Sequence, residues 1–274
     1  MLEWPAMSST SAKRPAVLVF AGLDPTGGAG LQADIEAIGS LGGHALPVAT
    51  AITAQDTRDV KSCNAVSAIS IIEQARVVLE DIAVDAFKVG LIASVEAIGA
   101  IHTILEEYQG VPVVIDPVCA STAGTPLVDD EQIDAMVSLL LPLATVVTPN
   151  TNEARLLTPE ADSLNASAQE LLTYGSEYVL LTGTHEPSPQ IVHRLYSNRR
   201  LIESFECERL PASYHGSGCT LSAAIAALLG HGLEPLAAIG EALAYTFESL
   251  KRGSAMGSGQ LIPQRLFQTR KVGR

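Results

Sequence analysis

Short apolar runs alternate with helix-like segments along most of this chain, and this alternation limits the folds it can adopt. The first run, residues 16–21, is bounded by glycine and is typical of a buried strand. Similar runs follow near residues 47–54, 86–89, 111–115, 145–148 and 178–181. Helix-like segments occupy residues 31–41, 71–82, 95–108, 131–141, 152–157, 168–174, 219–229 and 235–250. Strands that alternate with helices predict a doubly wound α/β fold, with a mainly parallel sheet and helices on both faces.

The alternation stops after residue 190. Two runs, 191–196 and 201–205, flank Ser197-Asn198 and predict an antiparallel hairpin at one edge of the sheet. No internal repeat, linker or charge discontinuity marks a second domain. We therefore expect one domain over residues 16–252, a disordered N-terminal tail over 1–15 and a C-terminal tail over 253–274.

The charge balance narrows the classes of partner. The chain has 17 Lys and Arg against 30 Asp and Glu, a formal net charge of −13, and no basic run before its last residues. Nucleic acids and anionic membranes are bound through basic patches, so neither is an expected partner. The four cysteines form no Cys-x-x-Cys pair, which fits a reducing compartment, and we find no signal pattern or membrane-length apolar run. We expect a cytoplasmic protein.

A glycine-rich turn, His215-Gly-Ser-Gly-Cys-Thr220, runs directly into a helix that is apolar on nearly every side. Such a helix is buried, and its N-terminus presents free N–H groups that favour an anion. Gly216, Ser217 and Gly218 lie at this end, and the pKa of the Cys219 thiol is expected to fall there. The alternative is a tight turn before a core helix, with the cysteine as a small apolar residue. Taken alone, the segment leaves both interpretations open.

Earlier in the chain, another glycine-rich loop, Gly22-Leu-Asp-Pro-Thr-Gly-Gly-Ala-Gly30, follows the first predicted strand, and we call it the first glycine loop. It departs from both the dinucleotide-binding fingerprint and the phosphate-binding loop of nucleotide hydrolases. It is nevertheless a polar loop at the edge of the sheet where α/β proteins bind ligands. Asp24 lies in this loop, and Asp34 and Gln55 lie near it. Each has an ordinary structural interpretation: Asp24 caps a turn, Asp34 lies on an exposed helix face and Gln55 ends a strand. The alternative for all three is that they bind the substrate.

Oxygen ligands follow two further strands. Asp116 comes directly after the strand near 111–115, and Asn150 and Glu153 follow the strand at 145–148. Each alone is a common turn or cap residue, but together they suit Mg²⁺ held partly through water. A metal site that faces an anion site predicts phosphoryl transfer. A Cys219–His215 hydrolase is the rival, but it leaves Asp116 and Glu153 without a role.

Five motifs, in this order along the chain, carry a resemblance to a known family: Ala21-Gly-Leu-Asp-Pro-Thr-Gly-Gly-Ala-Gly-Leu-Gln-Ala-Asp34, Thr50-Ala-Ile-Thr-Ala-Gln55, Asp116-Pro-Val, Thr148-Pro-Asn-x-x-Glu153 and His215-Gly-Ser-Gly-Cys-Thr-Leu-Ser222. They resemble the hydroxymethylpyrimidine/phosphomethylpyrimidine kinases of thiamine biosynthesis, within the ribokinase-like superfamily. The resemblance covers residues 17 to 250.

The resemblance implies two ATP- and Mg²⁺-dependent steps, which convert 4-amino-5-hydroxymethyl-2-methylpyrimidine to its monophosphate and then to the diphosphate. It also implies a homodimer. It assigns Gln55 to the aminopyrimidine edge, and gives the pocket around the ring to Asp34, Gly22, Asp24, Gly30 and Leu91. The residues that it assigns to binding Mg²⁺ and ATP are Asp116, Asn150, Glu153 and Thr182, with Asp116 and Glu153 as the metal ligands. Gly216-Ser217-Gly218-Cys219 match the anion hole, with Cys219 as the acceptor of the hydroxyl proton.

The chain departs from the family at Thr182-Gly-Thr-His185, where relatives often have Lys-Gly-Gly-His. The lysine expected to reach ATP phosphate is therefore missing, and Arg58 and Lys88 are candidates to replace it. Leu91 stands where many relatives have Met, and Asp56 where Asn is common. Residues 120–128 are the expected flap. A pyridoxal-type kinase and a non-catalytic pyrimidine-binding protein are the two alternatives.

Overall fold

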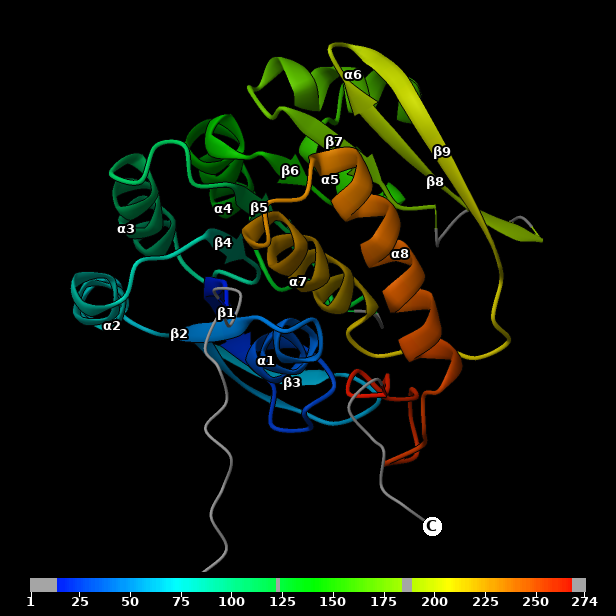
Figure 1. Ribbon diagram of the computed structural model, residues 1–274, viewed down its shortest axis with the longest axis horizontal. Helices are drawn as coiled ribbons and strands as arrows, with labels where there is room; N and C mark the ends of the chain where they lie inside the picture. The colour runs from blue at the N-terminus through cyan, green and yellow to red at the C-terminus, as the bar shows by residue number, and fades with distance from the viewer. Residues whose placement is uncertain (1–13, 122–123, 184–188, 268–274) are drawn as a thin grey trace, which may run out of the picture.

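The computed structural model describes residues 14–121, 124–183 and 189–267. Within these residues, nine strands form one sheet of order β3-β2-β1-β4-β5-β6-β7-β8-β9 (Figure 1). The strands are β1 Ala16–Leu23, β2 His44–Gln55, β3 Val60–Ala65, β4 Ala86–Val89, β5 Val113–Ile115, β6 Val146–Val147, β7 Tyr178–Leu181, β8 Gln190–Ser197 and β9 Arg200–Glu208. The helices are α1 Gly30–Ser40, α2 Ala68–Asp81, α3 Val95–Glu106, α4 Asp130–Ala135, α5 Thr151–Leu157, α6 Leu164–Thr173, α7 Ser217–Gly230 and α8 Pro235–Lys251.

The pairing of the strands confirms the predicted fold class. Strands β1, β2, β4, β5, β6 and β7 are parallel, and the hairpin of β8 and β9 lies antiparallel to β7 at one edge. A further strand that the sequence did not predict, β3, pairs antiparallel with β2 at the other edge. Its sequence, Val-Lys-Ser-Cys-Asn-Ala, is mostly exposed, so it lacks the apolar run that identifies a buried strand.

Two apolar cores lie on opposite faces of the sheet because successive side chains of a strand point in opposite directions. In β1, Leu18 and Phe20 pack in the core that α2 to α6 cover. Val17 and Val19 pack in the core under α1, α7 and α8. Figure 1 shows α1, α7 and α8 together on that face. The expected helix at 131–141 is α4 followed by a π-helical turn, Met136–Leu140, and a 3-10 turn, Leu141–Leu143.

Part of the C-terminal tail that we expect over residues 253–274 contacts the rest of the protein. Ser254 pairs with Ile262, Leu261 pairs with Tyr214, and Arg265 has no exposed surface. Residues 268–274 and 1–13 of the expected tails lie outside the described residues.

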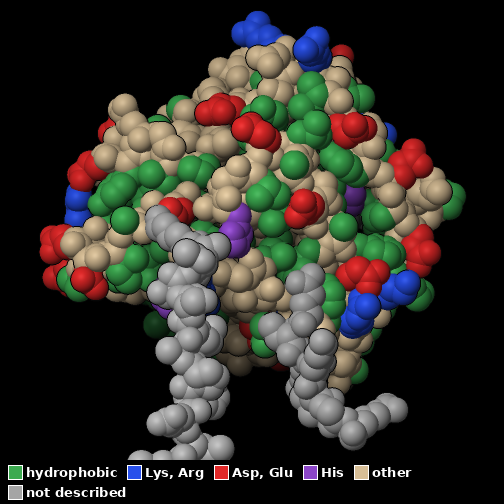
Figure 2. All heavy atoms as spheres, viewed as in Figure 1, with side chains coloured by type: hydrophobic (Ala, Val, Ile, Leu, Met, Phe, Trp, Pro, Cys, Tyr) green, Lys and Arg blue, Asp and Glu red, His purple; other side chains and the backbone are tan. Residues whose placement is uncertain are grey.

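The surface in Figure 2 shows acidic side chains scattered among apolar and uncharged ones, with Lys and Arg mainly near the margins. No helix within the described ranges is long and apolar enough to cross a membrane.

Candidate active site

The direction of winding reverses at β1, which lies between β2 and β4. In an α/β sheet, such a switch point opens a crevice at the carboxyl ends of the strands. The first glycine loop leaves β1 there, and Leu91 follows β4. A Cβ atom built on Gly22 would lie 3.2 Å from Cδ2 of Leu91. The structure therefore places two of the predicted pocket residues against each other.

Asp24 organises the first glycine loop. Its buried carboxylate accepts hydrogen bonds from the backbone N–H groups of Thr26 and Ala29, both at 2.8 Å, and lies 2.9 Å from Nε2 of His215. Burial opposes ionisation, but the hydrogen bonds from His215, Thr26 and Ala29 outweigh it and lower the pKa of Asp24. The turn or cap role that the sequence left open for Asp24 is thus present in the structure.

The two glycine-rich segments contact each other through their backbones. Helix α7 begins at Ser217, two residues before the expected start, and its N-cap Gly216 has a positive φ of 77°. A Cβ atom on Gly216 would lie 2.0 Å from the carbonyl oxygen of Gly28, and one on Gly28 would lie 2.1 Å from Cδ2 of His215. Only glycine permits this approach at either position.

Asp116 follows β5 and lies beside the N-terminus of α7. It is 4% exposed, and it accepts hydrogen bonds from the Ser222 hydroxyl, at 3.3 Å, and from the Cys219 thiol. A Cβ atom on Gly218 would lie 3.6 Å from Oδ1 of Asp116. The structure thus brings the predicted anion hole and the predicted carboxylate together at one point.

Cys219 does not have the lowered pKa that the sequence predicted. Cys219 is half-buried, and the desolvation of its thiol, together with the negative charges of Asp116 and Asp34, raises the pKa of the thiol to about 12, although Lys88 acts in the opposite direction. The backbone N–H of Gly30 donates a hydrogen bond to the sulfur. The prediction failed because it considered the helix N-terminus alone.

Lys88 and Asp34 form a fully buried ion pair, with Nζ 3.0 Å from Oδ2. Burial alone would lower the pKa of Lys88, but Asp34, Cys219 and Asp116 raise it, so the ammonium stays charged. Burial raises the pKa of Asp34 to about 6, against the effect of Lys88. Oδ1 of Asp34 has no hydrogen-bond partner within the described residues. Lys88 is therefore committed to the interior and is not available to reach an ATP phosphate.

Asn150 and Glu153 form a reciprocal cap on α5. The Asn150 side chain accepts hydrogen bonds from the N–H groups of Asn152 and Glu153, and Glu153 Oε2 accepts one from the N–H of Asn150 at 2.8 Å. Burial and the charge of Asp116 raise the pKa of Glu153 to about 8. Thr182 pairs with Asn150 as an isolated bridge. Thr184 and His185, the end of the departing motif, lie outside the described residues.

Gln55 ends β2, half-buried, and its amide donates to the Thr53 hydroxyl at 2.7 Å. The turn after β2 contacts the expected flap, residues 120–128. The hydroxyl groups of Ser121 and Thr125 in the flap donate to the carboxylate of Asp59 in the turn, at 2.8 and 2.7 Å. Residues 122–123 of the flap lie outside the described residues. Asp59 is not part of any motif in the sequence, so its contact with the flap was not predicted.

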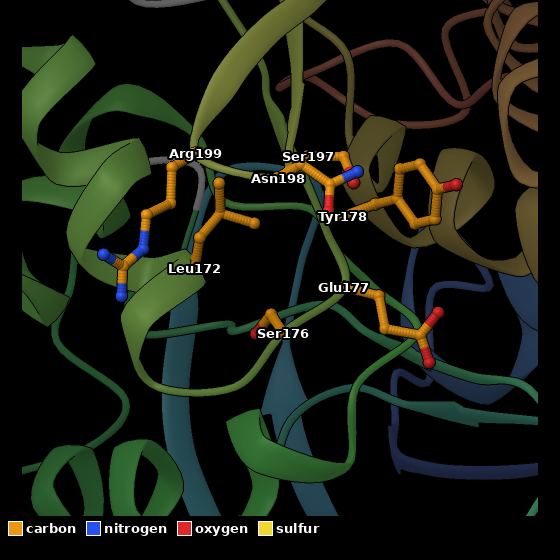
Figure 3. Close-up of a pocket in the computed structure, with 7 residues that line it drawn as sticks. All are labelled: Leu172, Ser176, Glu177, Tyr178, Ser197, Asn198 and Arg199. Atoms are coloured by element: carbon orange, nitrogen blue, oxygen red, sulfur yellow. The ribbon is translucent and has the colours of Figure 1, made fainter.

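Two cavities differ in their relation to this site. One, of about 650 Å³, lies between residues 23–27 of the first glycine loop, helix α1 and residues 254–264 near the C-terminus. The other, of about 380 Å³, lies at the start of β7 and the turn between β8 and β9 (Figure 3). Figure 3 shows Leu172 and Arg199 on one side of it and Glu177 and Tyr178 on the other. It opens at the amino end of β7, far from the carboxyl edge, so it is not part of the candidate site.

A family model described as phosphomethylpyrimidine kinase matches residues 24–264. A hydroxymethylpyrimidine/phosphomethylpyrimidine kinase of Mycobacterium tuberculosis (strain ATCC 25618 / H37Rv) is 38% identical over 260 residues, which cover 93% of this chain and 94% of the relative.

Two solved structures share the fold. The phosphomethylpyrimidine kinase of Clostridium difficile 630 has a TM-score of 0.74 and 32% identity, and the match covers 86% of this chain and 99% of that one. A Staphylococcus aureus pyridoxal kinase in complex with AMP-PCP and pyridoxal has a TM-score of 0.85 and 25% identity, over 95% of this chain and 96% of that one.

Proposed function

The chain belongs to the phosphomethylpyrimidine kinase family, and from this premise we propose that it phosphorylates 4-amino-5-hydroxymethyl-2-methylpyrimidine, and then the resulting monophosphate, for thiamine diphosphate biosynthesis. Each step transfers the γ-phosphoryl group of ATP to an oxygen of the substrate. A relative from Mycobacterium tuberculosis named for both activities, which aligns with 93% of this chain, supports the proposal.

One observation carries the proposal: the N-terminus of α7 lies directly against Asp116 at the carboxyl edge of the sheet. Phosphoryl transfer depends on positioning and on stabilising the charge of the transferred group. We assign the backbone amides of Gly216, Ser217 and Gly218 to that charge, because a helix N-terminus with close glycines is suited to a phosphate.

Cys219 is the proposed acceptor of the substrate hydroxyl proton. It lies in the first turn of α7, between the N–H of Gly30 and the carboxylate of Asp116. Its thiol is protonated at rest, but it donates a hydrogen bond to Asp116, so its own proton has a place to go.

The proposed pyrimidine pocket surrounds the crevice beside β1. Gln55 is assigned to the edge of the ring, where its amide can both donate and accept hydrogen bonds. The residues assigned to the walls are Gly22, Asp24, Gly30, Asp34 and Leu91. Of these, Asp34 is enclosed with Lys88, so it supports the pocket from beneath.

Mg²⁺ fits the donor set. Asp116 and Glu153 are buried carboxylates, and burial raises their pKa values because it disfavours the negative charge, which a divalent cation would compensate. The described residues hold no cluster of three His, Cys, Asp or Glu ligands, which suits an ion that keeps waters and phosphate oxygens as ligands. When bound, Mg²⁺ neutralises the charge of the ATP phosphates. Asn150 and Thr182 are the proposed contacts to those phosphates. The cytoplasmic location and the homodimer stay predictions.

A pyridoxal-type kinase is the second candidate, because the chain superposes on a pyridoxal kinase that binds AMP-PCP and pyridoxal. The test is ADP release in a coupled assay with the aminopyrimidine, its monophosphate, pyridoxal and pyridoxine. The proposal expects the highest kcat/KM with the two pyrimidines. Binding of the pyrimidine without turnover would show a non-catalytic protein. Gln55→Ala is the specificity control, and unchanged turnover of the pyrimidine would remove the role given to Gln55.

A further inference from the structure

Arg265 has no exposed surface, although it lies near the C-terminal end of the described chain. A buried guanidinium is costly unless its donors are satisfied. Its Nε donates to the Thr220 hydroxyl at 2.8 Å, and its Nη1 lies 3.2 Å from Glu36 Oε2 and 3.3 Å from the Gly27 carbonyl oxygen. Its Nη2 donates to the carbonyl oxygen of Gly28. One side chain thus joins the first glycine loop, α1 and α7.

The backbone around Arg265 is itself fixed. The Tyr245 hydroxyl on α8 donates to the carbonyl oxygen of Arg265 at 2.8 Å, and the N–H of Gln264 donates to the carbonyl oxygen of Ser249 at 3.0 Å. The turn that carries Arg265 is therefore held against α8, and it presents the guanidinium from a fixed backbone.

On the loop side, Arg265 holds carbonyl groups whose neighbouring amides are also bound. The N–H of Gly28 donates to the Thr26 hydroxyl, and the N–H of Ala29 donates to Asp24. The next amide, that of Gly30, donates to the sulfur of Cys219. The position of the Gly30 amide therefore depends on a loop that is held from both sides.

On the helix side, Arg265 holds the residue that follows Cys219. The Thr220 hydroxyl accepts the hydrogen bond from Arg265 and donates its own to the carbonyl oxygen of Gly216, at 2.7 Å. This fixes the first turn of α7 relative to its N-cap. Arg265 thus acts on both neighbours of the Cys219 sulfur, the loop amide and the helix turn.

We propose that Arg265 is a positioning residue, which sets the place of the Cys219 sulfur between the Gly30 amide and the Asp116 carboxylate. This positioning role rests on the proposed function, because it affects the reaction rate only if Cys219 accepts the substrate proton. Arg265 itself has no assigned contact with substrate or ATP. Its effect is geometric, because a displacement of about 1 Å in a reacting group costs about 100-fold in rate.

The test compares Arg265→Lys with the wild-type enzyme. Lysine keeps the charge but loses the planar fork that reaches several acceptors at once. Titration with the pyrimidine gives the number of functional binding sites, and kcat is expressed per site. We expect this kcat to fall by about tenfold or more, with the KM values for the pyrimidine and for ATP nearly unchanged. Thr220→Val, which removes the shared hydroxyl, gives a second variant if Arg265→Lys does not fold. Arg252→Lys is the matched control on the exposed end of α8, and its kinetics should equal those of the wild type.

A second readout does not depend on turnover. Iodoacetamide alkylation, followed by mass spectrometry of the peptides, reports the accessibility of each thiol. We expect Arg265→Lys to speed alkylation of Cys219 several-fold, while Cys63 on β3, an internal reference, keeps its rate. Unchanged Cys219 alkylation together with unchanged normalised kcat would overturn the proposal. If the wild-type protein phosphorylates no ring substrate, the proposed function fails, and the alkylation ratio still decides whether Arg265 positions Cys219.

Discussion

The ammonium nitrogen of Lys88 lies 3.0 Å from Oδ2 of Asp34, and neither side chain has any exposed surface. The pair lies beneath the candidate site, and its charges reach Cys219 and Asp116. Lys88 lowers the pKa values of Asp116 and Cys219, whereas Asp34 raises that of Cys219. The contribution of the buried pair to stability depends on both partners being present.

Lys88→Met is expected to lower the free energy of unfolding by about 3–5 kcal/mol, because it leaves the Asp34 carboxylate buried and unpaired. The double variant Asp34→Leu/Lys88→Met should recover most of this loss, since it removes both charges. Urea denaturation of the two variants and the wild type measures the difference. Lys61→Met, at an exposed lysine on β3, is the control and should change little. A single variant as stable as the wild type would show that the pair is not coupled.

Cys219→Ala is expected to lower kcat by about 100- to 10,000-fold, the usual range for a lost acid–base group. The anion hole is formed by backbone, so the KM for ATP should stay close to its wild-type value. ADP release under saturating substrate measures the effect. Cys63→Ala, at a half-buried cysteine outside the site, should have normal turnover. Near-normal turnover of Cys219→Ala would exclude Cys219 as the proton acceptor.

The sequence predicted the carboxyl edge of the sheet well, for a physical reason. Asp116 comes directly after β5 and Asn150 comes three residues after the end of β6, and in a parallel sheet such positions lie at the same edge. The glycines at positions 30 and 216 are also explained by local structure. Both have positive φ values, a conformation that other residues rarely adopt. Local patterns of this kind can be read without knowing the tertiary contacts.

The rest depends on contacts between distant parts of the chain. Arg265 lies in a segment without helical or strand periodicity, and its burial is explained by distant acceptors, which are Thr220, Gly27, Gly28 and the counter-ion Glu36. The pKa of Cys219 depends on burial and on two acids from other elements, which outweigh the helix N-terminus. Lys88 gave a signal that could have been used: a lysine in a strand of four buried residues requires a buried counter-ion.

Thr182→Lys is expected to strengthen ATP binding, because it restores the positive charge that related kinases often carry at this position. Thr182 pairs with Asn150 at the edge where the ATP phosphates are proposed to lie. One added charge-assisted hydrogen bond should lower the KM for ATP by up to about tenfold. The control is Thr182→Met, because methionine is about as long as lysine but carries no charge. It separates the effect of charge from that of size. An equal KM in both variants would mean that position 182 does not face the phosphates.

His193 on β8 is expected to make the stability of the protein dependent on pH. The residue is 8% exposed, its Nδ1 lacks a partner within the described residues, and burial lowers its pKa from 6.5 to about 4. The unfolded chain therefore binds a proton near pH 6.5, whereas the folded protein binds it only near pH 4. The stability from the neutral ring is complete above pH 6.5, and about 3 kcal/mol of it is lost as the pH falls to 4.

Urea denaturation at pH 7.5 and 4.5 measures this loss in the wild type and in His193→Asn. Other groups titrate in both proteins, so the difference between their two pH-dependent losses isolates His193. We expect the variant to lose less stability than the wild type between these pH values, even if it is less stable at pH 7.5. The neighbouring Cys207 sulfur, 3.9 Å from Nε2, is a weak partner and does not hold the imidazolium in place. Equal losses in the two proteins would show that the folded protein protonates His193 as readily as the unfolded chain does.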